Sequence, residues 1–188
     1  MLSQFLQKLL FVDQFGIADG KITLLGHRQI MLHASALLEL QEIDESMIYN
    51  IVKKSSFNNI NGAVEHAKVY KRIKNVIVNE LAQIGQKIGR NDEGAIKTLE
   101  SFFDIYGLGM MKIVNLDNQK NEASVEIKDS TIAGEWIEKN HKKSRSSVCT
   151  LTAGVLAGMF SYIFGKDVDC VEEKCRAKGN DYCLFEIA

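Results

Sequence analysis

Apolar residues recur every three to four positions over much of the first half of the chain, which predicts helices. Residues 2–11 form an amphipathic helix in this interpretation, with one face made by Leu2, Phe5, Leu6, Leu9 and Leu10. Helical spacing returns over about residues 29–40 and again over 44–53, where Asp44 suits an N-cap. An apolar face on a terminal helix needs a covering surface, so we expect this face to contact a partner or a second copy.

Turn residues interrupt the helical spacing at two places. Asp19-Gly20 suits a type I′ turn, which predicts a hairpin over about residues 15–25. A break in the helices is predicted by the poor helix formers Asn58, Asn59, Asn61 and Gly62. Beyond this break, the spacing predicts a long helix over residues 63–88 and a shorter one over 93–106.

The period changes to two after Gly107. Gly109–Asn115 and Ser124–Lys128 are predicted to be antiparallel strands joined by a polar turn, and a stretch of mixed spacing around Trp136 follows them. A helix over Ser147–Phe164, ended by Gly165, is expected next. The chain then finishes with two more predicted strands, Asp167–Lys174 and Tyr182–Ile187.

Helices followed by a hairpin-rich sheet predict an α+β fold. We expect an antiparallel sheet of about four to five strands packed against a helical layer, preceded by an N-terminal helix and hairpin. The chain divides in this interpretation at residue 60. Residues 1–60 make a dimer or partner region, and residues 61–188 make the main domain.

Composition excludes several classes of protein. The 188 residues are 46% hydrophobic, contain no proline and carry 23 Lys and Arg against 24 Asp and Glu. This composition excludes a disordered chain, and the balanced charge argues against direct nucleic-acid binding. The N-terminus lacks the basic region and cleavage site of a secretory signal, so we expect a cytoplasmic protein.

Residues 146–165 carry no charge and approach the roughly 20 residues that span a bilayer. Several serines, threonines and glycines lower the hydrophobicity of this segment, so we interpret it as a buried helix and expect no membrane span. Gly154 and Gly158, one turn apart, would allow a neighbouring helix to approach closely.

All four cysteines lie after residue 148: Cys149, Cys170, Cys175 and Cys183. A chain of this size builds a core without disulfides, and a reducing cytoplasm favours metal ligands or free thiols. Glu172, Cys175 and Cys183 lie on the terminal hairpin, and Cys149 begins the preceding helix, so a tetrahedral zinc site is one interpretation. Free thiols and a Cys175–Cys183 disulfide remain open alternatives. Strict strand alternation separates Glu172 from Cys175, so a shared site requires a bulge or a strand end near Lys174.

The C-terminal 41 residues, VCTLTAGVLAGMFSYIFGKDVDCVEEKCRAKGNDYCLFEIA, carry a family signature. Its marks are Cys149, the run Ala153–Gly158, Glu172, Cys175, Ala177, Gly179, Cys183 and Phe185. This stretch resembles the 4-vinyl reductase-like domain, the small-molecule-binding module of the nitric-oxide-signalling and Golgi-transport ligand-binding fold. Archaeal and bacterial stand-alone members and the sensor domains of phenol-responsive activators share the resemblance.

The resemblance implies a structural zinc held by Cys149, Glu172, Cys175 and Cys183. Cys170 has no place in the family pattern and is expected to be a spare thiol or an alternate ligand. Family members bind ligands in an apolar cavity between helices and sheet. The candidates for that role here are Phe102, Phe103, Tyr106, Trp136, Phe160 and Phe164.

We therefore expect residues 61–188 to be a ligand-binding domain with a structural zinc. Its ligand would be a small hydrophobic or aromatic molecule, and it would act as a homodimer or through a partner. A reductase or accessory protein for a vinyl tetrapyrrole is an alternative, although no G-x-G-x-x-G fingerprint follows a strand. A protein-assembly subunit similar to vesicle-tethering components is a second alternative.

Overall fold

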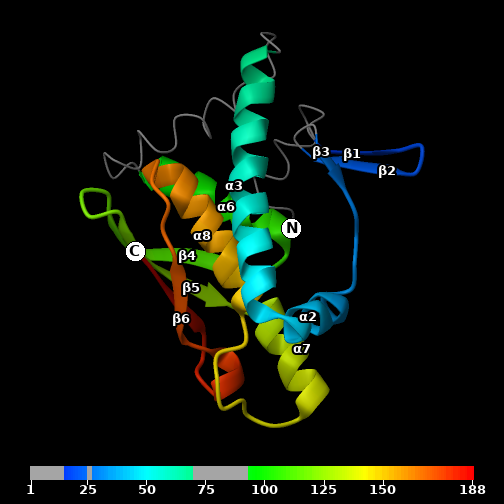
Figure 1. Cartoon of the computed structure of the whole chain (residues 1–188), viewed down its shortest axis with the longest axis vertical. Coiled ribbons are helices and arrows are strands. Elements are labelled where there is room, and N and C mark those ends of the chain that lie inside the picture. The colour runs from blue at the N-terminus through cyan, green and yellow to red at the C-terminus, as the bar shows by residue number, and fades with distance from the viewer. Residues whose placement is uncertain (1–14, 25–26, 70–92) are drawn as a thin grey trace.

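The computed structural model describes residues 15–24, 27–69 and 93–188 of the chain (Figure 1). The N-terminal part holds β1 (Phe15–Ala18), β2 (Lys21–Leu24), β3 (His27–Gln29), α2 (Ala34–Ile43) and α3 (Glu45–Val69). The middle part holds α6 (Glu93–Phe103), the 3-10 turn η1 (Asp104–Tyr106), β4 (Met110–Asp117), β5 (Glu122–Lys128) and α7 (Thr131–Asn140). The C-terminal part holds α8 (Thr150–Phe164), β6 (Cys170–Lys174), the 3-10 turn η2 (Arg176–Lys178) and β7 (Cys183–Ile187).

The larger sheet has the order β4-β5-β7-β6, and all its neighbouring strands are antiparallel. One face of this sheet is buried by Ala123, Val125, Ile127, Cys183, Phe185 and Ile187. The opposite face is polar along the same two strands, where Ser124 donates a hydrogen bond to Glu186 at 2.6 Å. This alternation gives an antiparallel sheet one core face and one solvent face.

A helical layer covers the core face, and the contact between α3 and α8 is its largest (Figure 1). Gly154 and Gly158 of α8 face α3. A Cβ atom at Gly154 would lie 2.8 Å from the Tyr49 carbonyl oxygen, and one at Gly158 would collide with the Lys53 carbonyl and lie 2.7 Å from Ser56 Cβ. Ser56 donates a hydrogen bond to the Val155 carbonyl at 3.0 Å. The two glycines therefore permit the close helix contact predicted from the sequence.

Several predicted elements are confirmed. The fold is α+β, and a smaller antiparallel sheet with the order β1-β2-β3 precedes the helices. Asp19 and Gly20 both have positive φ, as a type I′ turn requires, and Gly165 ends α8 at φ 65°. The predicted N-terminal helix over residues 2–11 and residues 70–88 of the predicted long helix lie outside the described residues.

Three predictions about local structure were wrong. No break occurs at Asn58, Asn59, Asn61 and Gly62, because α3 continues through them and its packing against α8 outweighs their poor helix propensity. The helix expected from residue 29 begins at Ala34, and His27–Gln29 instead pairs with β2 as a third strand.

The mixed stretch around Trp136 is the helix α7. Its N-cap is Ser130, whose hydroxyl accepts a hydrogen bond from the Ala133 backbone N–H at 3.4 Å. Its periodicity is weak because Ile132 and Ala133 are the buried residues of its first turn, while glutamates and a lysine follow. The side chain that caps this helix was a usable signal, since an Asp-Ser step precedes it.

Helix α3 crosses residue 60, the boundary expected from the sequence. The division at that residue stays a prediction. No helix within residues 15–24, 27–69 and 93–188 is long and apolar enough to cross a bilayer. The uncharged segment is instead α8, whose side chains are buried from Leu151 to Ser161.

We predict that Gly158→Ala lowers the free energy of unfolding by about 1–3 kcal/mol, because the new methyl group must displace the backbone of α3. Gly134→Ala is the matched control: in α7 the nearest atom to its Cβ is 4.0 Å away, so this change should be neutral or stabilising by up to about 1 kcal/mol. Chemical denaturation measures both values. Equal stability of Gly158→Ala and wild type would contradict the close contact.

Candidate metal centre

Three thiols and one carboxylate converge at the end of the larger sheet. One ligand atom from each of Cys149, Glu172, Cys175 and Cys183 lies within 4.8 Å of every other, and the three cysteine residues are fully buried. The Cys149 and Cys183 sulfurs are 3.8 Å apart, which equals the separation of about 3.8 Å between two thiolates on a tetrahedral ion with bonds of about 2.3 Å. The four cysteines of the chain form no disulfide. This group of side chains can hold a metal ion.

The four groups come from three elements. Cys149 is the N-cap residue of α8, Glu172 lies in β6, Cys175 follows β6 directly, and Cys183 begins β7. The register of β6 against β7 shifts between Glu172 and Lys174. This irregularity breaks the alternation along β6, so that Glu172 and Cys175 reach the same site. The geometric condition derived from the sequence is met.

The turn between Cys175 and Cys183 is shaped by backbone hydrogen bonds. The Arg176 N–H donates to the Cys183 sulfur at 3.3 Å, and Asn180 donates to the Cys175 carbonyl at 2.9 Å. Gly179 adopts a φ of 99°, which strains any residue with a Cβ atom. An N–H bond to a thiolate stabilises its charge and orients the ligand.

The Glu172 carboxylate is fixed by one oxygen and leaves the other without a partner. Its Oε2 accepts hydrogen bonds from the backbone N–H groups of Val148 at 3.1 Å and Cys149 at 2.9 Å, at the N-terminus of α8. Its Oε1 is buried and has no hydrogen-bond partner. A buried oxygen without a partner is rare and costly, and coordination to a cation would satisfy it.

Two side chains outside the ligand set hold Cys149 in place, and sequence reasoning missed both. The Ser130 hydroxyl lies 3.4 Å from the Cys149 sulfur. Gln41 in α2, which is 1% exposed, donates to the Val148 carbonyl at 2.6 Å and accepts from the Leu151 N–H at 2.8 Å. A glutamine in an amphipathic helix carries no pattern that identifies such a role.

The protonation of the metal-free cluster is shared among its members. Hydrogen bonds from the Cys149 and Cys183 thiols lower the pKa of Cys175, while the same contacts and burial raise the pKa of Cys149. Burial, followed by the charge of Cys175, raises the pKa of Glu172 to about 7. A single thiolate is therefore favoured at neutral pH. Ionisation of all four groups requires a compensating cation.

Residues 125–188 match the model of the 4-vinyl reductase-like domain family. This part of the chain is a 4-vinyl reductase-like domain. It contains all four groups of the candidate metal centre and the α7–β7 segment that carries them, whereas Gln41 reaches the domain from α2.

Known proteins resemble the chain beyond its 4-vinyl reductase-like domain. The uncharacterised protein MJ0150 of Methanocaldococcus jannaschii is 27% identical over 116 residues, which is 61% of this chain and 64% of that protein, less than two thirds of its length. The phenol-responsive sensory domain of the transcription activator PoxR, solved with phenol, has a TM-score of 0.65 at 17% identity over 100% of this chain and 90% of that chain. The two proteins share a fold over the whole length of this chain.

Two further solved structures are similar at lower scores. A vinyl-4-reductase family protein from Methanocaldococcus jannaschii has a TM-score of 0.48 at 16% identity, covering 86% of this chain and 83% of its own. A trafficking protein particle complex subunit 3 from Naegleria fowleri, covalently bound to palmitic acid, has a TM-score of 0.48 at 13% identity, covering 82% and 89%.

Cys170, the fourth cysteine of the 4-vinyl reductase-like domain, does not join the cluster of four groups. It is buried at the start of β6, opposite Ile187, and its backbone N–H donates to the Tyr49 hydroxyl at 2.9 Å. Burial raises its pKa, which keeps the thiol protonated. Its place in the strand agrees with a spare thiol.

Five of the aromatic candidates belong to one hydrophobic core that the 4-vinyl reductase-like domain shares with α6, while the side chain of Phe102 lies outside the described part of the structure. Phe103 and Phe160 are fully buried, and Tyr106, Trp136 and Phe164 pack partly buried against the same core. Ring centroids are 6.2 Å apart for Phe103 and Tyr106 and 5.6 Å apart for Phe160 and Phe164. Burial raises the pKa of Tyr106 to about 12, although a hydrogen bond with Ser56 partly offsets this. A ligand role for these residues stays a prediction.

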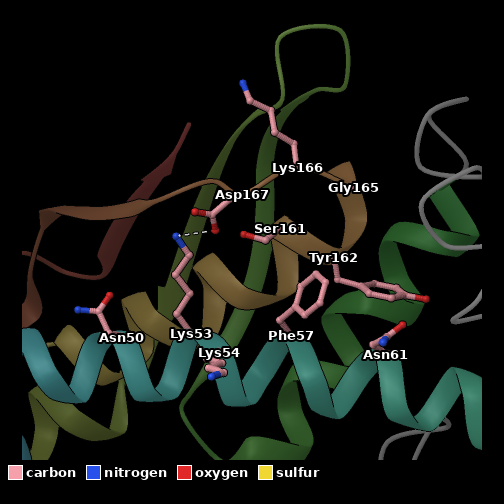
Figure 2. Close-up of a pocket in the computed structure, with 10 residues that line it drawn as sticks. All are labelled: Asn50, Lys53, Lys54, Phe57, Asn61, Ser161, Tyr162, Gly165, Lys166 and Asp167. Carbon is pink, nitrogen blue, oxygen red and sulfur yellow. Dashed lines mark ion pairs between the residues drawn. The ribbon is translucent and has the colours of Figure 1, made fainter.

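A pocket of about 750 Å³ lies elsewhere, between α3 and the C-terminal end of α8 (Figure 2). None of the aromatic candidates lines it, and the sequence analysis did not find it. It is lined by Asn50, Lys53, Lys54, Phe57, Asn61, Ser161, Tyr162, Gly165, Lys166 and Asp167.

We predict that metal affinity falls more steeply with pH in wild type than in Glu172→Gln below about pH 7. The raised pKa means that the carboxyl takes up a proton as the pH falls through about 7, and the metal must then displace that proton. The thiols contribute equally to both proteins, so Glu172→Gln lacks this one step. Competition titration with a chromophoric chelator between pH 5.5 and 8.5 measures it. Parallel pH profiles would show that Glu172 is not a ligand.

Proposed function

We propose that this chain is a cytoplasmic sensor domain that binds a small hydrophobic or aromatic molecule, is held together by a structural zinc ion, and acts as a homodimer. The convergence of three buried thiols with the buried, unpartnered Glu172 oxygen carries the proposal. The fold shared with a phenol-responsive sensory domain over the whole chain supports it.

Zinc suits this ligand set better than other common cations. Three thiolates and one carboxylate exclude calcium and magnesium, which prefer oxygen ligands, and a four-coordinate set is the usual structural zinc site. The four protein ligands leave no position for water, so the metal would stabilise rather than catalyse. It would join the N-terminus of α8 to the β6–β7 hairpin. The family signature in the sequence supports the same assignment for the four ligands.

The hydrophobic core around Phe103, Tyr106, Trp136, Phe160 and Phe164 is the proposed ligand site. Aromatic side chains provide large apolar contact surfaces, and Tyr106 adds a hydroxyl group that a polar ligand atom can reach. Rigid helices α6, α7 and α8 and the turn η1 carry these five residues. A ligand inserted among them would shift the elements that the zinc ion fixes.

Exposed apolar side chains on α2 and α3 support self-association. Leu40, Ile43, Met47 and Ile51 follow one another at helical spacing across the two helices, and Ile43 is 76% exposed. Large exposed apolar groups of this kind mark contact surfaces. We place the dimer contact there, together with the N-terminal apolar face predicted from Leu2 to Leu10.

Native mass spectrometry of the purified chain is expected to give two chains carrying two zinc ions. Cys183→Ser should lose the zinc ion and unfold at a lower denaturant concentration, because structural metal binding contributes to folding. Cys170→Ser is the matched control, since Cys170 is also buried on the same hairpin but outside the cluster. Zinc well below one per chain in wild type, or unchanged zinc in Cys183→Ser, would refute the clamp.

Phenol is expected to bind with an affinity that Trp136→Ala lowers about five-fold, because an aromatic contact contributes about 1 kcal/mol. Tyr182→Ala serves as the control, since Tyr182 lies in the same 4-vinyl reductase-like domain but near Lys174, outside the aromatic core. Isothermal titration calorimetry measures the three affinities. Absence of binding by phenol and by larger alkylphenols, or equal losses in the two variants, would argue against a ligand site in this core.

A further inference from the structure

The pocket between α3 and α8 has the size of a small-molecule site. Its volume of about 750 Å³ falls within the range of roughly 300–1,000 Å³ typical of ligand pockets. It is separate from the aromatic core proposed above, because none of the five aromatic candidates lines it. Its lining combines two aromatic rings, two amides and several charged side chains.

The rings of Phe57 and Tyr162 form an apolar wall. They lie edge to face with centroids 6.1 Å apart, Phe57 from α3 and Tyr162 from α8 (Figure 2). Phe57 is 37% exposed, so part of an apolar ring faces the pocket without cover from the described residues. A flat aromatic ligand would bury this surface.

The charged lining has an excess of cations. Lys53, Lys54 and Lys166 line the pocket together with a single carboxylate, Asp167. Lys53 extends from α3 to Asp167 at 2.9 Å (Figure 2) and also binds Asp169 at 2.7 Å. Its charge is therefore compensated twice. Within the described part of the chain, Lys54 and Lys166 form no ion pair.

We propose that this pocket binds a small organic anion in which an aromatic ring carries a carboxylate. The ring would pack against Phe57 and Tyr162, and the carboxylate would bind the ammonium groups of Lys54 and Lys166. Both lysines are exposed, and their long flexible stems can turn toward a bound anion. Two uncompensated lysines beside an uncovered aromatic wall match this class of ligand in charge and shape. A neutral aromatic would satisfy only the wall, and an inorganic anion only the lysines.

The ion pair at Lys53 gives the pocket an adjustable third cation. Asp167 is 85% exposed, so it can return to water at little cost when a ligand carboxylate takes its place. Lys53 keeps its bond to Asp169, which also accepts a hydrogen bond from Tyr49 at 3.1 Å. The lysine thus stays positioned at the pocket with or without a ligand.

Calorimetric titration with 2-naphthoate tests the proposal, with the neutral 2-naphthamide as the matched ligand. We expect the acid to bind more tightly than the amide and to bind more weakly as salt rises. The double variant Lys54→Gln/Lys166→Gln should lose about ten-fold in affinity for the acid, or about three-fold for each exposed charge. Lys97→Gln/Lys142→Gln removes two exposed lysines outside the pocket and should bind like wild type.

Equal binding of acid and amide, or equal affinity in the two double variants, would overturn the proposal, and so would no binding of 2-naphthoate at millimolar concentration. Loss of binding in Trp136→Ala without loss in Lys54→Gln/Lys166→Gln would place the anion in the aromatic core and also overturn it. Zinc content and phenol affinity are measured on the same samples. If both persist while 2-naphthoate fails to bind, only the assignment of this pocket is refuted.

Discussion

Three buried thiols and a buried carboxyl share a space in which every ligand atom lies within 4.8 Å of the others, and this constraint dominates the 4-vinyl reductase-like domain. Four acidic groups so close together cannot all ionise without a cation, and the protonated cluster leaves one carboxylate oxygen without a partner. A divalent metal ion resolves both problems at once. It also joins the start of the most buried helix to the last two strands, which otherwise contact each other through a short irregular turn. The cluster therefore acts as the point that fixes the C-terminal half of the fold.

The helix α3 attaches to this fixed part in two ways. Gly154 and Gly158 allow it to lie against α8 at backbone distance, which no larger residue would permit. Tyr49 and Lys53 then bind Asp169, and the Tyr49 hydroxyl also accepts from the Cys170 backbone N–H at the edge of the sheet. The hydrogen bond from Lys53 lowers the pKa of Asp169, which keeps this carboxylate charged. The long helix is thus tied to β6, the strand that supplies Glu172.

This arrangement relates the proposed sites to one another. Lys53 lines the pocket beside α3 and, through Asp169, contacts the segment that leads into the metal centre. The aromatic core lies on the other side of the same helix pair, since Ser56 of α3 interacts with Tyr106 while Phe57, the next residue, faces the pocket. A shift of α3 relative to α8 would be felt at both places. Such a shift is a physical route by which a bound molecule can alter the surface of α2 and α3.

The sequence by itself determined the elements whose signals are local. Period-two spacing placed β4 and β5, Asp19-Gly20 placed the first hairpin, and Gly165 ended α8, because each of these depends on the conformational preferences of neighbouring residues. The four metal-binding candidates were also identifiable, because their spacing matched a family signature. Only the tertiary structure decided that Asn58–Gly62 stays helical, that β6 is irregular after Glu172, and that Gln41 holds the backbone around Cys149. The pocket between α3 and α8 belongs with these, since it joins residues about 100 positions apart in the sequence. Packing between distant segments outweighs local propensity at such places, and no local pattern records it.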